Sequence, residues 1–124
     1  MTKKQNILIV EDDLNTQILY KALLSDKYEL FTCDTVLQAK EYLKKDGIDL
    51  VILDLSLKGA DDGLVLAQYI RSSKKWNNTT ILAVTAHAFV FDKERCLEAG
   101  CNAFLTKPLK GNTLVDHVNR ILGN

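Results

Sequence analysis

The sequence predicts an α/β fold in which five parallel strands alternate with helices on both faces of one sheet. Two patterns predict it. Short, nearly all-apolar runs occur at residues 6–10, 50–53, 80–84 and 103–105, as expected for strands that are buried on both faces. Segments with apolar residues at helical spacing lie between these runs, so strand and helix alternate along the chain.

One strand candidate differs from the others. The run 28–33 is mixed, because Glu29 and Thr32 interrupt its apolar residues, and we therefore expect it at an edge of the sheet. Right-handed crossovers leave few arrangements of five parallel strands. The flavodoxin-like, doubly wound order 2-1-3-4-5 places this strand at an edge and is the predicted topology.

The helices are predicted from apolar residues that share one face. The expected faces are Leu14, Ile18, Ala22 and Leu23 in the first helix, Val36, Ala39 and Leu43 in the second, residues 64–71 in the third, residues 93–99 in the fourth, and Leu114, Val115, Val118, Ile121 and Leu122 in the fifth. Asp34 is a suitable N-cap for the second helix, and Gly100 can close the fourth.

Length and composition predict one compact domain, residues 1–124, of which 47% are hydrophobic. Lys plus Arg and Asp plus Glu both number 16, so the formal net charge is zero and nothing indicates direct nucleic-acid binding. No apolar run approaches the roughly 20 residues of a membrane span. We therefore expect a cytoplasmic protein without a membrane segment.

The three cysteines are odd in number and irregularly spaced, which argues against a disulfide framework. They also lack the partners that a four-ligand zinc site needs. We expect all three to be reduced and mostly buried.

Polar residues gather at the carboxyl ends of the predicted strands. Strands one, three, four and five are neighbours in the predicted order, and open sheets of this type bind ligands beyond those ends. The residues concerned are Glu11, Asp12 and Asp13 after the first strand, Asp54 at the end of the third, Thr85 at the end of the fourth and Lys107 after the fifth.

These residue types suit phosphoryl chemistry. Crowded carboxylates need a counter-charge, and oxygen ligands of this kind suit Mg²⁺. Glu11 and Asp12 are better placed for it than Asp13, which is expected to start the following helix. Asp54 is the candidate nucleophile, because carboxylates can form aspartyl-phosphates. Thr85 could donate a hydrogen bond to a phosphoryl oxygen, and Lys107 could pair with another.

The motifs at residues 7–13, 50–55, 83–86, 96–101 and 103–108 together resemble the receiver domains of two-component response regulators, in particular stand-alone, chemotaxis-regulator-like ones. The resemblance implies that a histidine kinase or histidine phosphotransfer protein phosphorylates Asp54 in the presence of Mg²⁺. It implies four metal ligands: Glu11, Asp12, Asp54 and the backbone carbonyl of Ser56. A receiver is a signalling domain that assists its own phosphorylation and dephosphorylation rather than an enzyme.

The resemblance also implies a cis peptide bond before Pro108 and a switch formed by Thr85 and Phe104. That switch would alter the face of the fourth helix, fifth strand and fifth helix, which a downstream protein would read.

The sequence departs from the receiver pattern at three places. Lys58 stands where proline is common, and the following loop to Gly63 is one residue longer. Phe104 stands where tyrosine is often found, so the switch residue has no hydroxyl group. His87 lies two residues after Thr85, at a position that can influence the lifetime of the phosphoryl group.

Other functions on a similar fold remain as alternatives. A phosphatase of the haloacid-dehalogenase type would need a second aspartate where this chain has Ser56. A flavin or nucleotide carrier would need a glycine-rich phosphate loop after the first strand, and none is present. A receiver that works only by docking would not need the complete set of site residues.

Overall fold

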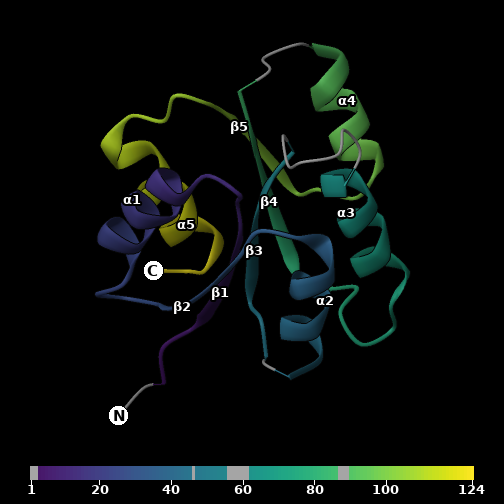
Figure 1. Cartoon of the computed structure of the whole chain (residues 1–124), viewed down its shortest axis with the longest axis horizontal. Helices are drawn as coiled ribbons and strands as arrows, with labels where there is room; N and C mark the ends of the chain where they lie inside the picture. Colours follow the sequence, from purple (N-terminus) through teal and green to yellow (C-terminus); the bar gives the residue numbers. More distant parts are fainter. Residues whose placement is uncertain (1–2, 46, 56–61, 87–89) are drawn as a thin grey trace.

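The computed structural model describes residues 3–45, 47–55, 62–86 and 90–124. Strands and helices alternate along the chain (Figure 1). In chain order they are β1 (Asn6–Val10), α1 (Leu14–Leu24), β2 (Glu29–Cys33), α2 (Val36–Lys45), β3 (Leu50–Asp54), α3 (Asp62–Ser72), β4 (Thr80–Thr85), α4 (Val90–Glu98), β5 (Ala103–Thr106) and α5 (Gly111–Ile121).

The strands form one parallel sheet in the order β2-β1-β3-β4-β5, so the predicted flavodoxin-like topology is confirmed. The mixed strand β2 lies at an edge, as its composition indicates. Figure 1 shows α1 and α5 on one face of the sheet and α2, α3 and α4 on the other. All strand carboxyl ends therefore point to the same rim.

The core consists of two clusters, one on each face of the sheet. Alternate residues of each central strand enter different clusters, because successive side chains of a strand point to opposite faces. In β1, Ile7 and Ile9 pack toward α1 and α5, whereas Leu8 and Val10 pack toward α2, α3 and α4. All four are completely buried. Burying each such side chain stabilises the fold by roughly 1.5–3 kcal/mol, which explains why nearly every central-strand residue is apolar.

The predicted core face of α1 is wrong for Leu14, Ile18 and Ala22, whereas Leu23 packs against the core as predicted. Leu14 and Ile18 are 67% and 56% exposed, whereas Tyr20 and Leu24 are buried against the sheet. Apolar residues occur on more than one side of this helix, so spacing alone does not select a face. The face of α1 that contacts the sheet is the one that carries the large Tyr20 ring, and Leu14 and Ile18 remain at the surface.

The helix ends are fixed by local hydrogen bonds. Thr35 caps α2, because its Oγ1 accepts a hydrogen bond from the N–H of Gln38 at 3.1 Å. The prediction of Asp34 as the cap is therefore wrong by one residue: α2 begins at Val36, and the residue directly before it takes the cap position. Gly100 follows α4 with φ of +108°, which favours glycine, and it closes the helix as predicted.

All three cysteines are free and buried, which agrees with the expectation from their number and spacing. The five helices have between 9 and 11 residues. Within the part of the chain that the structure describes, none of them has the length and apolar character needed to cross a bilayer.

Candidate functional site

Three carboxylates meet where β1 and β3 end. Glu11 and Asp12 follow β1 directly, and Asp54 is the last residue of β3. One oxygen atom from each lies within 4.8 Å of the others. Glu11 and Asp54 are only 1% and 3% exposed, so two of the three side chains are almost completely shielded from water. The fold thus brings together the acids that the sequence places at these strand ends.

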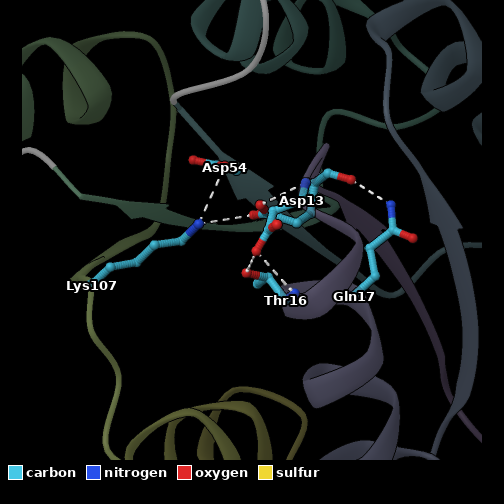
Figure 2. Close-up of polar contacts among 6 residues, drawn as sticks. Asp13, Thr16, Gln17, Asp54 and Lys107 are labelled. Atoms are coloured by element: carbon cyan, nitrogen blue, oxygen red, sulfur yellow. Dashed lines mark hydrogen bonds and ion pairs between the residues drawn. The ribbon is translucent and has the colours of Figure 1, made fainter.

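Hydrogen bonds fix the position of Glu11. Its N–H donates to the carbonyl of Cys33 at 2.9 Å, which continues the ladder between β1 and β2. The side-chain amide of Gln17 donates to the Glu11 carbonyl, and the N–H of Asp13 donates to Glu11 Oε1 at 3.2 Å (Figure 2). Gln17 is not among the site residues predicted from the sequence. The only signal for it is a polar residue in the first turn of α1.

Asp13 belongs to α1 rather than to the acidic cluster. Its Oδ2 accepts hydrogen bonds from both the N–H and the hydroxyl group of Thr16, as Figure 2 shows. The bond from the hydroxyl group lowers the pKa of this exposed carboxyl. A negative charge is also favourable at a helix N-terminus. This geometry agrees with the expectation that Asp13 starts the helix.

Lys107 supplies the positive charge of the site. Its Nζ lies 3.1 Å from Glu11 Oε2 and 3.3 Å from Asp54 Oδ2, so one ammonium group bridges two carboxylates (Figure 2). The N–H of Lys107 donates to the carbonyl of Thr85 at 2.7 Å, which ties the segment after β5 to the end of β4. The lysine therefore reaches the acids from a backbone that the sheet holds in place.

The site has unusual electrostatics. Burial, followed by the hydrogen bond and charge of Asp54, raises the pKa of Glu11 to about 7, although Lys107 acts in the opposite direction. Burial by itself would lower the pKa of Lys107, but the two carboxylates outweigh it and the pKa is raised. The lysine therefore stays charged, whereas Glu11 can hold a proton near neutral pH in the metal-free protein.

The donor set fits a small, hard cation. Mg²⁺ binds oxygen ligands at about 2.0–2.1 Å. The three carboxylate oxygens lie within 4.8 Å of each other, so one ion placed between them could reach carboxylates of this cluster. The partly exposed Asp12 leaves a side of the cluster open to water. The backbone carbonyl of Ser56, expected as a further ligand, lies outside the described residues.

Thr85 and Phe104 lie on the same face of the sheet. Thr85 ends β4 and is 1% exposed, next to the end of β3, where Asp54 pairs with Val84. Phe104 pairs with Ala83, two residues before Thr85. Because side chains alternate along a strand, Thr85 and Phe104 point to the same side, where Phe104 packs against the α2, α3 and α4 cluster. They are therefore diagonal neighbours.

A groove of about 500 Å³ separates α1 from the segment after β5. It is lined by Thr16, Leu19, Tyr20, Ala86, Lys107, Pro108 and Leu109. The peptide bond between Lys107 and Pro108 is cis, the geometry that the receiver resemblance implies. Tyr20 was expected neither in this groove nor in the core, because a single tyrosine in a helix carries no specific signal.

Some predicted features lie outside the described residues. These are Ser56, Lys58 in the lengthened loop and His87. The described site therefore rests on Glu11, Asp12, Asp54, Thr85, Phe104 and Lys107.

Comparisons with known proteins agree on one family. Residues 7–119 match the model of the response regulator receiver domain. The chain is 27% identical over 125 residues to the polar-differentiation response regulator DivK of Brucella ovis. The match covers all of this chain and 99% of that protein.

Two solved structures of receiver domains are similar to this chain. One is the receiver domain of a sensor histidine kinase from Pseudomonas aeruginosa, whose structure has a magnesium ion coordinated in its active site cleft. It is 31% identical, with a TM-score of 0.86, and the match covers 98% of this chain and all of that one. The other is the signal receiver domain of a histidine kinase from Syntrophus aciditrophicus, 28% identical, with a TM-score of 0.86 and coverage of 96% and 90%. The chain therefore belongs to the response regulator receiver domain family.

Proposed function

We propose that this receiver domain, comprising residues 1–124, accepts a phosphoryl group on Asp54 and thereby switches a protein-binding surface. One observation carries the proposal. The Asp54 carboxylate ends a central strand, is 3% exposed, and lies beside both a lysine ammonium and two further carboxylates. Such a site combines a nucleophile, a fixed positive charge and ligands for a divalent cation, which are the main requirements of phosphoryl transfer.

The chemistry follows from the positions of these groups. An oxygen of Asp54 attacks phosphorus, a new P–O bond forms, and the bond from phosphorus to the donor imidazole nitrogen breaks. The imidazole leaves with the electron pair and takes up a proton from water. Lys107, 3.3 Å from Asp54 Oδ2, can pair with an oxygen of the transferred group, and the Thr85 hydroxyl can donate to another.

The proposed cofactor is Mg²⁺. Glu11, Asp12, Asp54 and the carbonyl of Ser56 would hold it, and the cation would offset charge on the phosphoryl oxygens. The magnesium ion in the related Pseudomonas aeruginosa receiver domain supports this choice. The same residues would assist dephosphorylation, so the domain takes part chemically in setting its own phosphorylation level while remaining a signalling domain.

The proposed donor is a histidine kinase or a histidine phosphotransfer protein. Next to the site, three large apolar residues of α1 lie at the surface: Leu14, Ile18 and Leu19 are 67%, 56% and 49% exposed. The groove at Leu19 continues to Lys107. Large apolar side chains grouped beside a phosphoacceptor support approach of a protein donor from this side. Replacing Ile18 by serine should slow transfer from a phosphorylated donor protein and leave transfer from a small donor unchanged.

The proposed reader is a downstream protein that contacts α4, β5 and α5. The zero formal net charge favours a protein reader over direct nucleic-acid contact, and we expect the exchange to take place in the cytoplasm without a membrane partner. The phosphatase and carrier alternatives are not favoured, because the family match spans residues 7–119.

The test is phosphorylation by a small acyl phosphate in the presence of Mg²⁺. Intact-protein mass spectrometry should show one acid-stable, base-labile phosphoryl group, and borohydride reduction followed by peptide mapping should locate it at Asp54. The Asp54→Asn variant is the matched control and should gain none. Equal labelling of that variant would reject the assignment.

A further inference from the structure

A second, smaller groove lies at the amino-terminal ends of the strands, opposite the rim that carries Asp54. It has a volume of about 260 Å³ and opens between the end of α2 and the connection from α3 to β4. Ile48 and Thr79, which precede β3 and β4, are among the residues that line it, whereas Asp54 and Thr85 end the same two strands. A molecule bound here would leave the rim with Asp54 open.

An aromatic side chain lines this groove and packs against a second ring. Trp76 lines it and is partly exposed, although it stands in a polar connecting segment. Its ring packs against that of Tyr69, with 5.6 Å between centroids, and the ammonium of Lys40 lies 4.4 Å from the Tyr69 centroid. A ring that is already packed against a neighbour has less conformational freedom to lose when a ligand binds. Trp76 is therefore suited to be an anchor for an apolar or aromatic side chain.

The groove is also positively charged. Lys44, Lys45 and Lys75 line it, and its described lining contains no acid. A helix C-terminus favours cations, which accounts for the first two in the last turn of α2 but not for Lys75 in another segment. Glu41 pairs with Lys44 at 3.5 Å, but both side chains are more than half exposed, so the pair is weak. The chain as a whole has no net charge, so the cluster is a local feature.

These features select one class of occupant. The three lysines are exposed, so they form no enclosed pocket for a small anion. They are also few, which does not suit the many phosphate contacts of a nucleic acid. The geometry points to a groove that binds an acidic segment of a partner protein, with one aromatic or large apolar side chain against Trp76 and carboxylates facing Lys45 and Lys75. Such a partner would tether the domain while Asp54 is phosphorylated.

The chain provides its own probe, because Trp76 is its only tryptophan. A synthetic peptide of glutamates around one phenylalanine should change Trp76 fluorescence saturably, and more salt should weaken binding. Lys45→Glu and Lys75→Glu should each weaken it at least about threefold, as expected for the loss of one charge contact and the gain of a repulsion. Lys21→Glu, an exposed reversal on α1, is the matched control and should bind like the unmodified protein.

Three results would overturn the proposal: no saturable change at about millimolar peptide, equal weakening by Lys21→Glu, or equally tight binding of a lysine-rich peptide or a single-stranded oligonucleotide. Calorimetry with Trp76→Ala, which should lose most of the affinity, tests the anchor independently of fluorescence. The proposed phosphorylation can fail separately, because Asp54→Asn should bind the peptide normally and the lysine variants should accept phosphate normally.

Discussion

The ammonium of Lys107 lies 3.1 Å from Oε2 of Glu11, a residue 96 positions earlier in the chain. It lies 3.3 Å from Asp54 as well, so a single cation joins two almost fully buried carboxylates. Two such acids close together would repel each other and favour protonation. In the metal-free protein, Lys107 therefore offsets the repulsion between these two acids.

Lys107→Met should destabilise the metal-free protein by roughly 1–3 kcal/mol, because it leaves buried carboxylates without their counter-charge. Urea unfolding in EDTA measures the effect, and added Mg²⁺ should recover part of the loss. Lys110→Met is the control: Lys110 is exposed, and its side chain makes no capping hydrogen bond, so little change is expected. Equal stability of the two variants would contradict the proposed role of Lys107.

A second prediction follows from Glu11, whose pKa burial raises from 4.5 to about 7. The folded protein then holds this proton more tightly than the unfolded chain does. The stability contributed by Glu11 is fully present below about pH 4.5 and is lost as the pH rises through about 7. In EDTA, the free energy of unfolding should therefore carry a component that falls by roughly 1–3 kcal/mol across this window.

The measurement is the difference between the unmodified protein and Glu11→Gln, taken at each pH by urea unfolding. The amide cannot ionise, so the variant should lack this component of the pH dependence. Parallel curves for the two proteins would show that Glu11 titrates normally.

The metal ligands can be separated by single substitutions. Asp12→Ala should greatly weaken Mg²⁺ binding, measured by calorimetry, and Glu11→Ala should do the same. Asp13→Ala should leave Mg²⁺ affinity nearly unchanged, while lowering stability by about 1 kcal/mol through loss of the α1 cap. If Asp13→Ala proved the most damaging of the three for Mg²⁺, the choice of ligands would be wrong.

The sequence was sufficient to predict the sheet and the location of the site. A run such as 50–53 has no polar residue, which is typical of a strand buried on both faces, and parallel strands bring their ends to one rim. Asp54 and Lys107 could therefore be assigned to one place without coordinates. The bridge from Lys107 to both Glu11 and Asp54 could not be predicted, because it depends on the exact course of the segment after β5.

Elsewhere the local pattern was ambiguous or contradicted. The apolar residues of α1 do not fall on one side, and the burial of Tyr20 rather than Leu14 is decided by packing against the sheet. Asp34 and Thr35 are both good N-cap residues, and the position at which α2 begins selects Thr35. The raised pKa of Glu11 likewise arises only from burial in the assembled fold.

Gly63 should be needed for close packing behind the phosphoacceptor. A Cβ atom at this position would lie 3.0 Å from the carbonyl oxygen of Asp54 and 3.1 Å from Cα of Leu55. Gly63→Ala should therefore shift the start of α3, destabilise the protein by roughly 1–3 kcal/mol and slow phosphorylation by a small acyl phosphate. Gly111→Ala is the control, since a Cβ atom at that position in α5 would meet nothing within 4 Å. Similar behaviour of both variants would contradict the prediction.

The last prediction concerns the switch. A phosphoryl group on Asp54 adds charge and acceptor oxygens beside the end of β4. Thr85 is the neighbouring hydroxyl donor and should move toward it. Because Phe104 lies diagonally beside Thr85 on the same face, it can fill the vacated space by rotating inward. The surface of α4, β5 and α5 should then change, and the unphosphorylated protein should already populate this state in part.

Amide exchange or NMR chemical shifts, recorded with and without a beryllium fluoride mimic of the phosphoryl group, test this route. Changes should concentrate on β5 and the neighbouring parts of α4 and α5. Thr85→Ala should abolish them while leaving Asp54 able to accept phosphate, because the variant lacks the hydroxyl that responds to the new group but keeps Asp54 and Lys107. Responses confined to α1 and α2, or an undiminished response in Thr85→Ala, would exclude the coupling between Thr85 and Phe104.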